Sequence, residues 1–416
     1  MKRIAYAWIA TRRLGWARWG AVLALAVPLQ NAPAQEAVRP DVGKPLQAAQ
    51  ELIKAQKFKD ALAKVRDADA VANKTPNETF LVERMRIAAA SGAGDVETAA
   101  KSFEVLSASG KVPGPEKVRM VESLAGAYYR AKDYAKAMVW SQRYFKEGGT
   151  NPSIRTLLIQ SQYLSGDFSG AAKELTTEIQ AAEKNGTAPA QERLNLLLNA
   201  GTQMKDPNTT VYALERLVTY YPKKEYWVDL LSRMQRKPNF SDRLALDTYR
   251  LSLATGSMTA ANDFMEMAQL ALQAGLPAEG KQVVDKGFAS GTLGNGAEGE
   301  RHKRLRDLVN KKLEEDKVMR ADAEKQALAD KDGTALVNAG FNLVYNGQAT
   351  KGLPMMQQGI AKAGLKRPDD ARLHLAIAHL MAGDSAKAQG ILKTVGGGDG
   401  TADLARLWAL YAKRKS

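Results

Sequence analysis

The sequence predicts an all-α fold, a solenoid of antiparallel helical hairpins, and three observations support this prediction. Residues 131–137 (AKDYAKA) and 165–171 (SGDFSGA) lie 34 positions apart, and each combines a polar turn, an aromatic residue and an alanine three residues after it. After residue 44 the apolar residues recur at helical spacing, and few segments alternate with a period of two. Prolines and glycines fall between these segments, where they separate one helix from the next.

The first four hairpins are predicted from their second helices, each of which begins at a polar turn followed by an apolar residue and an alanine. These two residues are, in chain order, Phe58 and Ala61, Val96 and Ala99, Tyr134 and Ala137, and Phe168 and Ala171. Antiparallel helices approach closely only where one presents a small side chain, so the alanines are expected at helix crossings. A single hairpin does not bury its apolar face alone, and stacked neighbours therefore supply one continuous core.

Five further hairpins follow a looser pattern. The turns that mark them are at Pro222, Pro238, Gly275, Gly347 and Gly383. These assignments predict a flexible mature N-terminus over 35–44, an N-terminal array over 45–296, further repeats over 332–402 and a capping helix over 403–416.

Residues 297–331 break the repeat pattern, because they are dense in both charges and have only a narrow apolar stripe. We expect a long, exposed helix that links the two arrays and is a candidate for partner docking or dimerisation. The alternative is a distorted repeat whose charges form a solvated face.

The period, the turn–aromatic–alanine pattern and Trp227 resemble the tetratricopeptide (TPR) repeat family, over about residues 45–402 and most strongly over 118–185. The resemblance to a bacterial, exported member implies a right-handed superhelical solenoid of about nine repeats, some of them degenerate. It also implies that the first helices of the hairpins line a concave groove that binds a partner.

Carried onto this sequence, the family pattern predicts a set of partner-binding positions, called here the predicted groove residues. They are Arg119, Glu122, Tyr129, Arg130, Thr156, Gln160, Tyr163, Asp229, Ser232, Gln235, Arg236, Asn338, Phe341, Tyr345 and His374. Tyrosine and arginine suit this role because they offer large contact areas and directed hydrogen bonds. The alternative for Tyr129 and Tyr163 is packing in a seam between helices, and for Arg130 it is a solvated helix end.

The N-terminus predicts export. Residues 1–34 hold five basic and no acidic residues, a short apolar run over 21–29, and Ala32-Pro33-Ala34 as a small-residue cleavage site. These features indicate a signal peptide cut after Ala34, and hence a periplasmic or secreted protein; the alternative is an uncleaved amphipathic anchor. No other run approaches membrane-spanning length.

Charge indicates the class of partner. The formal net charge is +15, and without the five basic residues of the leader it is +10. This excess favours anionic partners, such as acidic proteins or polymers. Nucleic-acid binding is not favoured, since the basic residues form no concentrated patch.

No motif predicts catalysis, a cofactor or a metal. The chain has no cysteine, and His374 and His379 lie five residues apart, so they do not share a helix face. Residues 294–299 spell GxGxxG, but a helical pattern precedes them where a nucleotide site needs a strand. Residues 275–282 resemble a phosphate loop but end in Gln282 instead of serine or threonine. We therefore expect a non-enzymatic protein; the alternative is a hydrolase or transferase within 299–416 whose groups converge from distant positions.

The functional hypothesis is an exported adaptor that binds another envelope protein, or a peptide segment of one, through the predicted groove. The alternative is a scaffold associated with exopolysaccharide export or peptidoglycan. It would use the aromatic group Tyr212, Tyr220, Tyr221, Tyr226 and Trp227 to stack on sugars, although the same residues suit hairpin packing around Pro222. The sequence favours no particular oligomeric state.

Overall fold

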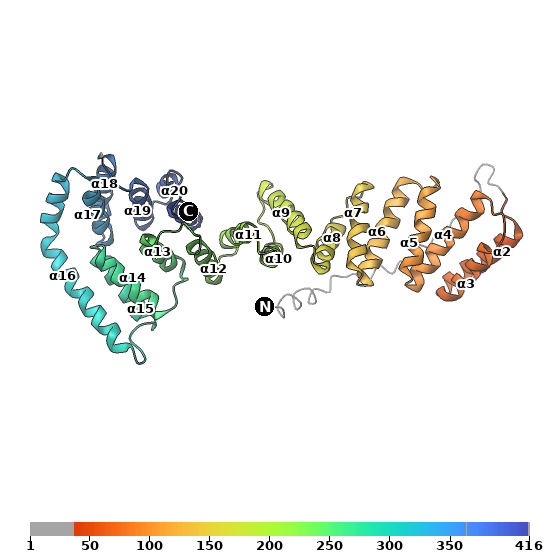
Figure 1. Cartoon of the computed structure of the whole chain (residues 1–416), viewed down its shortest axis with the longest axis horizontal. Coiled ribbons are helices and arrows are strands. Elements are labelled where there is room, and N and C mark those ends of the chain that lie inside the picture. Colours follow the sequence, from red (N-terminus) through yellow and green to blue (C-terminus); the bar gives the residue numbers. More distant parts are fainter. Residues whose placement is uncertain (1–36, 363, 415–416) are drawn as a thin grey trace. The chain divides into compact units, whose positions relative to one another are not determined.

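The computed structural model describes residues 37–362 and 364–414, and it is all helical over these ranges (Figure 1). They contain twenty α-helices, one short 3-10 helix and no strand. Nine consecutive helix pairs account for every one of these α-helices except α16 and α21. The predicted all-α fold of stacked hairpins is confirmed. The predicted signal peptide lies outside the described residues.

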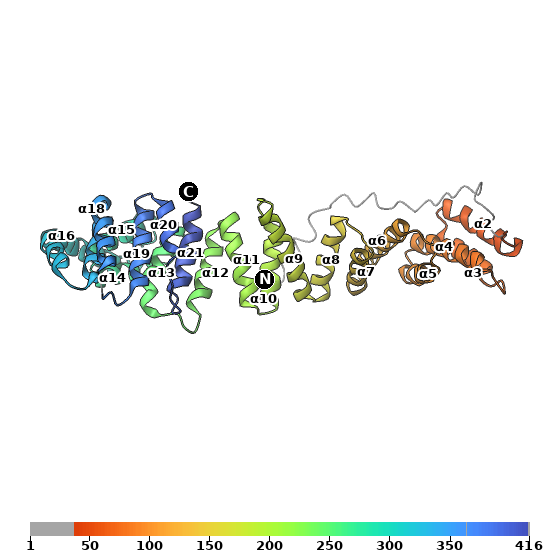
Figure 2. The same ribbon diagram turned by 90° about the horizontal axis from the view of Figure 1, so that it is seen from above.

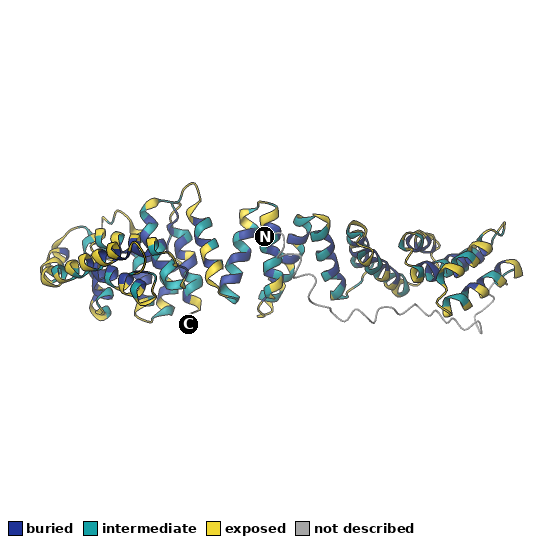
Figure 3. Cartoon of the chain, turned by 90° about the horizontal axis from the view of Figure 1, so that it is seen from below, coloured by how far each residue is buried: buried dark blue, intermediate teal, exposed yellow. Residues whose placement is uncertain are grey.

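The chain divides into two compact units, Met1–Glu174 and Leu175–Ser416. The boundary falls within α9 (Phe168–Lys184). In Figure 3, buried and exposed residues alternate along the helix ribbons of both units. Each helix therefore has one buried side and one exposed side.

The first unit is a run of hairpins. Its helices before α9 are α2 (Pro40–Lys54), α3 (Phe58–Asp69), α4 (Pro76–Ala93), α5 (Val96–Ala108), α6 (Gly114–Arg130), α7 (Tyr134–Lys146) and α8 (Pro152–Ser165). Helix α2 begins inside the segment 35–44, for which no helix was expected. Pro40 occupies its first turn, and Arg39 before it forms an ion pair of 2.8 Å with the buried Glu78 of α4.

Local sequence explains where the second helices start. Asp95 and Asp133 cap α5 and α7, because each carboxylate accepts a hydrogen bond of 3.1 Å from the backbone N–H three residues later. The alanines expected at the crossings are buried, with exposed fractions of 0% for Ala61 and Ala137 and 1% for Ala99. The prediction of close crossings at these positions is confirmed.

The second unit is longer and begins within α9. Its helices after α9 are α10 (Gln191–Gln203), α11 (Pro207–Tyr220), α12 (Lys224–Gln235), α13 (Ala245–Thr255), α14 (Ala261–Gln273), α15 (Pro277–Ala289), α16 (Gly299–Ala329), α17 (Gly333–Tyr345), α18 (Ala349–Ala361), α19 (Pro368–Met381), α20 (Ser385–Leu392) and α21 (Thr401–Lys413). The 3-10 helix Asp242–Leu244 precedes α13.

The last hairpins of this unit turn back onto its earlier helices. Helix α17 packs against α15, and α21 packs against α11 and α13. Figure 2 shows α21 beside α13 and α20. One core therefore combines residues distant in sequence, such as Trp227 of α12, Phe341 of α17 and Trp408 of α21. The helix expected to cap the final hairpin does contact α19 and α20, and it also forms part of this shared core.

Glycines allow α17 and α18 to cross with their backbones in contact. A Cβ atom built on Gly340 would lie 2.6 Å from the carbonyl oxygen of Gly352, and one on Gly359 would lie 2.7 Å from that of Gly333. Both oxygens are backbone atoms, so they cannot move aside as the end of a flexible side chain could. Only glycine fits these positions without separating the two helices.

We predict that Gly340→Ala lowers the free energy of unfolding by about 1–3 kcal/mol, because the added methyl group meets backbone. The matched control is Gly390→Ala in α20, where an added Cβ has no neighbour within 4 Å. The control should be neutral or stabilise by about 0.5–1 kcal/mol, because alanine favours helix. Urea unfolding measures both, and an equal effect of the two variants would contradict the close crossing.

Candidate functional site

In the first unit, three predicted groove residues join successive hairpins. Glu122 of α6 accepts a hydrogen bond of 2.7 Å from the side-chain amide of Asn151, which caps α8. The hydroxyl of Tyr129 donates one of 2.9 Å to Gln160 of α8. Burial raises the pKa of Tyr129, so its hydroxyl stays protonated at neutral pH. These contacts support the alternative given above for Tyr129, namely that it packs in a seam between neighbouring helices.

The remaining predicted residues of the first unit differ in exposure. Tyr163 is half-buried and packs edge-on against Phe168, with ring centroids 5.2 Å apart. Thr156 is also half-buried. Arg119 and Arg130 are exposed at opposite ends of α6, so they remain accessible to a partner.

Three of the C-terminal predictions instead belong to a polar cluster inside the second unit. Arg250 of α13 is 4% exposed and binds both carboxylate oxygens of Glu279 of α15, at 2.7 and 2.6 Å. It also donates to Asp247, at 2.7 Å. Tyr345 donates to Glu279 at 2.8 Å, and His374 lies 2.8 Å from Asp247 through Nε2.

Phe341 completes the cluster. Its ring stacks on the imidazole of His374, with centroids 5.1 Å apart, and the guanidinium of Arg250 lies 4.9 Å from its centroid. With 1% of its surface exposed, Phe341 has no face left for a partner, so its predicted role in the groove is wrong. Tyr345 and His374 likewise direct their polar atoms into the cluster, whereas Asn338 is exposed.

The charges of the cluster stabilise one another. Burial raises the pKa of Asp247, but the charges of His374 and Arg250 outweigh it and hold that pKa well below its usual range. Burial lowers the pKa of Arg250, but the surrounding interactions, that with the charge of Glu279 first, together outweigh burial and raise this pKa well above its ordinary value. Burial and the charge of Glu279 both raise the pKa of Tyr345. Asp247 and Arg250 are therefore ionised at neutral pH, while Tyr345 is neutral.

The sequence prediction missed Asp247, Arg250 and Glu279. The available signal was the spacing of Arg250, four residues after Leu246 and four before Ala254, which places it on an apolar side of a helix. A charged residue at such a position is buried only when it is paired.

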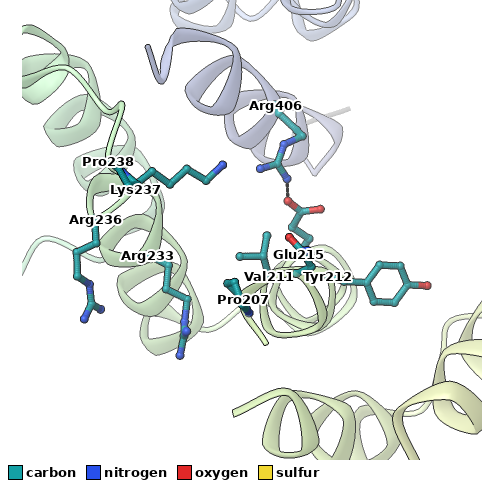
Figure 4. Close-up of a pocket in the computed structure, with 10 residues that line it drawn as sticks. Pro207, Val211, Tyr212, Glu215, Arg233, Arg236, Lys237, Pro238 and Arg406 are labelled. Atoms are coloured by element: carbon teal, nitrogen blue, oxygen red, sulfur yellow. Dashed lines mark ion pairs between the residues drawn. The ribbon is translucent and has the colours of Figure 1, made fainter. Parts of the chain in front are cut away.

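On α12 the predicted residues lie at a groove that α11 and α21 complete (Figure 4). This groove, called here the α12 groove, has a volume of about 560 Å³. It is lined by Pro207, Asn208, Val211, Tyr212, Glu215, Arg233, Arg236, Lys237, Pro238 and Arg406. Of the predicted residues Arg236 lines it directly, and Gln235 is an exposed neighbour outside the lining.

Asp229 and Ser232 hold the cations of the groove in place. Asp229 accepts a hydrogen bond of 2.8 Å from Arg233, and the hydroxyl of Ser232 accepts one of 2.7 Å from Arg236. Both pairs are four residues apart, which places them on one helix face. In the described part of the chain Arg236 has no carboxylate partner.

The opposite wall comes from α21. Arg406 forms an ion pair with Glu215 of α11, which Figure 4 marks with a dashed line. Lys237 contacts Asp403 of α21 at 2.8 Å. Pro207, Val211 and Pro238 supply apolar surface beside these charges.

The loop before α21 is fixed by Arg243, which pairs with Asp370 of α19 and Asp399. Asp399 also accepts a hydrogen bond of 2.8 Å from Thr401, and its backbone carbonyl accepts one of 2.9 Å from the N–H of Ser241. The hydrogen bond from Arg243, followed by that from Thr401, lowers the pKa of Asp399 to about 2.

The aromatic residues near the groove are used for packing. Trp227 is 1% exposed, the hydroxyl of Tyr221 donates to the carbonyl of Pro189 at 2.9 Å, and that of Tyr226 donates to Asn195 at 3.2 Å. Tyr220 lies 3.2 Å from Glu183 through its hydroxyl. These contacts support hairpin packing for Trp227, Tyr220, Tyr221 and Tyr226, whereas the half-buried Tyr212 lines the α12 groove and stacks against the guanidinium of Arg216.

The two motif-like segments are inter-helix turns. Residues 294–299 follow the helix α15 and not a strand, and the N–H of Gly294 donates to Nδ1 of His302 at 3.1 Å. Gly275 and Pro277 form the turn into α15, with Pro277 in its first turn. Over residues 37–362 and 364–414 no cluster of three or more histidine, aspartate or glutamate side chains is arranged to hold a metal. None of the helices in the same ranges is both long and apolar enough to cross a bilayer.

Comparison with known proteins adds little to this description. No family model and no curated protein sequence matches the chain. Among solved structures it is similar to yeast Tom70, with 12% identity and a TM-score of 0.24 over 90% of this chain and 96% of the other. It is also similar to the TPR domain of P58(IPK), with 11% identity and a TM-score of 0.22 over 90% and 98%. At these scores the fold assignment depends on the helix packing described above.

We predict that Arg250→Ala lowers the free energy of unfolding by about 3–5 kcal/mol, because it leaves the buried carboxylate of Glu279 without a cation and leaves Asp247 with His374 alone. The control is Arg233→Ala, which breaks an ion pair with Asp229 that is about one-third exposed. That variant should lose less than about 1 kcal/mol. Urea unfolding measures both, and similar losses would show that the buried cluster does not hold the unit together.

We further predict a pH-dependent contribution from Asp399. Because its folded pKa is lowered to about 2, it stabilises the fold above the ordinary aspartate pKa, and this contribution is lost as the pH falls from about 4 towards 2. At pH 7 Asp399→Asn should cost about 1 kcal/mol, a value reduced by solvent because the side chain is 42% exposed. The stability difference between the two proteins, measured by urea unfolding at successive pH values, should shrink below pH 4; a constant difference would contradict the assignment.

Proposed function

We propose that this protein is a non-enzymatic interaction scaffold that binds an acidic segment of a partner protein in the α12 groove. The observation that carries the proposal is the gathering of Arg233, Arg236, Lys237 and Arg406 around an apolar floor. Arginine binds carboxylates through two parallel hydrogen bonds, so this lining suits glutamate or aspartate side chains.

The internal ion pairs of the groove are compatible with such a ligand. The side chain of Arg406 is 43% exposed and that of Lys237 is 44% exposed. Surface ion pairs of this kind contribute about 0–1 kcal/mol each, so a partner carboxylate competes for these cations at small cost. Arg236 is available without any exchange, since its contacts are with Ser232 alone.

We also propose that the protein is exported and that its partner belongs to the cell envelope. The basic leader, the apolar run and the Ala32-Pro33-Ala34 site support export. The net charge of +10 that remains after removal of the leader supports an anionic partner. A glycan-binding role receives less support, because Trp227 is buried and the hydroxyls of Tyr221 and Tyr226 are used within the fold.

We predict that Arg236→Gln weakens binding of an acidic peptide about tenfold, because a charged hydrogen bond contributes about 1.5–3 kcal/mol. A suitable probe is a fluorescein-labelled peptide that mixes glutamate and leucine, followed by fluorescence anisotropy. The matched control is Gln235→Glu, which changes the net charge by the same amount at an exposed neighbour outside the lining. The control should change affinity less than about twofold, since exposed charges are screened.

Two further measurements separate this groove from other surfaces. A version of the peptide with glutamine in place of glutamate should not bind, and Arg119→Glu with Arg130→Glu should leave binding unchanged. If the double reversal abolishes binding while Arg236→Gln has no effect, the partner docks on α6 and the α12 groove is not its site.

A further inference from the structure

Helix α16 uses only one face for packing within the second unit. His302, Leu305 and Val309 are buried against α14 and α15. Further along, Asp316 accepts a hydrogen bond of 2.8 Å from Asn342 of α17, and Ala327 is buried. These positions recur at intervals of three, four, seven and eleven residues, all close to whole helical turns, so they define one side of the helix.

Outside this packed side, α16 carries exposed apolar residues. Leu308, Val318 and Met319 are 45%, 83% and 60% exposed, which makes this helix the densest source of exposed large apolar side chains in the described chain. A stripe outside the packed side, called here the α16 stripe, consists of Arg304, Leu308, Lys312, Glu315, Met319 and Asp322. Its spacings of three and four residues are those of a helix seam that pairs with another helix.

The charges of α16 are divided between its two halves. Residues 300–312 contain six basic and two acidic residues, whereas residues 313–325 contain three basic and five acidic residues. Two copies of the helix therefore attract each other when antiparallel and repel each other when parallel.

The α16 stripe is also self-complementary about its midpoint, between residues 313 and 314. In an antiparallel pair with that centre, Leu308 lies opposite Met319 of the second copy, and Lys312 lies opposite its Glu315. Arg304 lies within one residue of the position opposite Asp322. Each contact occurs twice, because such an interface has twofold symmetry.

We propose that the α16 stripe is a homodimerisation surface, on which a second copy of this chain binds in antiparallel orientation with Lys312 opposite Glu315. The proposal is independent of the α12 groove. A pair of helices in contact over these residues is a small interface beside the roughly 1,200–2,000 Å² of a stable complex, so we expect a weak, reversible dimer.

The first test uses the full chain in sedimentation equilibrium from about 1 to 200 µM, a range that brackets a micromolar Kd. A reversible monomer–dimer equilibrium is expected. Lys312→Glu should raise Kd at least about tenfold, because it places two like-charged pairs in the seam. Adding Glu315→Lys to that variant should return Kd to within about threefold of the original value. In both pairs opposite charges then face each other again, with their signs exchanged.

The matched control is Lys303→Glu. Lys303 pairs with Glu300 at 2.7 Å, just as Lys312 pairs with Glu315 at 2.8 Å, so both variants lose the same kind of contact within the helix. Lys303 lies off the stripe, so its reversal should leave Kd unchanged. The combination of Arg304→Asp and Asp322→Arg exchanges the charges of the second pair, and like the first exchange it should retain the dimer.

A second test determines the register. The chain has no cysteine, so Leu308→Cys and Met319→Cys each introduce a single thiol. A short bis-maleimide should cross-link a mixture of the two variants and neither variant alone. A monomer over the whole range, an equal effect of Lys303→Glu and Lys312→Glu, or failure of both charge exchanges to restore the dimer would each overturn the proposal.

Discussion

Arg250 connects four helices that are distant in sequence. Through Glu279, Asp247, Tyr345 and His374 it links α13 to α15, α17 and α19. Burying one guanidinium with two carboxylates is favourable only when every partner is in place, because an unpaired charge in this setting is costly. The cluster therefore specifies a single arrangement in which the last hairpins return to the earlier ones. The core that includes Trp227, Phe341 and Trp408 forms in that same arrangement.

The local part of this structure is accessible from the sequence. The turn residues Asp95 and Asp133, the buried Ala61, Ala99 and Ala137, and the helix breaks at glycine and proline act over a few residues, so the helices and their pairing were predictable. The return of α17–α21 was not, because it depends on contacts between residues more than 100 positions apart, such as His374 with Asp247. No periodic pattern within one hairpin encodes such a contact.

The same distinction applies to the predicted groove residues, which the structure places in different surroundings. Arg236 lies at the groove because its position follows from the outward face of α12. Phe341 occupies the corresponding outward face of α17, yet α13 and α19 cover it. Arg406 was not predicted because it reaches the groove only through the return of α21. An outward position on a repeat helix thus predicts a binding residue only where no later segment packs on it.

The two walls of the α12 groove are made at very different times during synthesis. Lys237 and Asp403, which bridge them, are 166 residues apart in the chain. A nascent polypeptide that has completed α12 has the arginines of one wall but no opposing surface. A partner that binds as proposed therefore finds a complete groove only after α21 has been translated and has folded back onto α11 and α13.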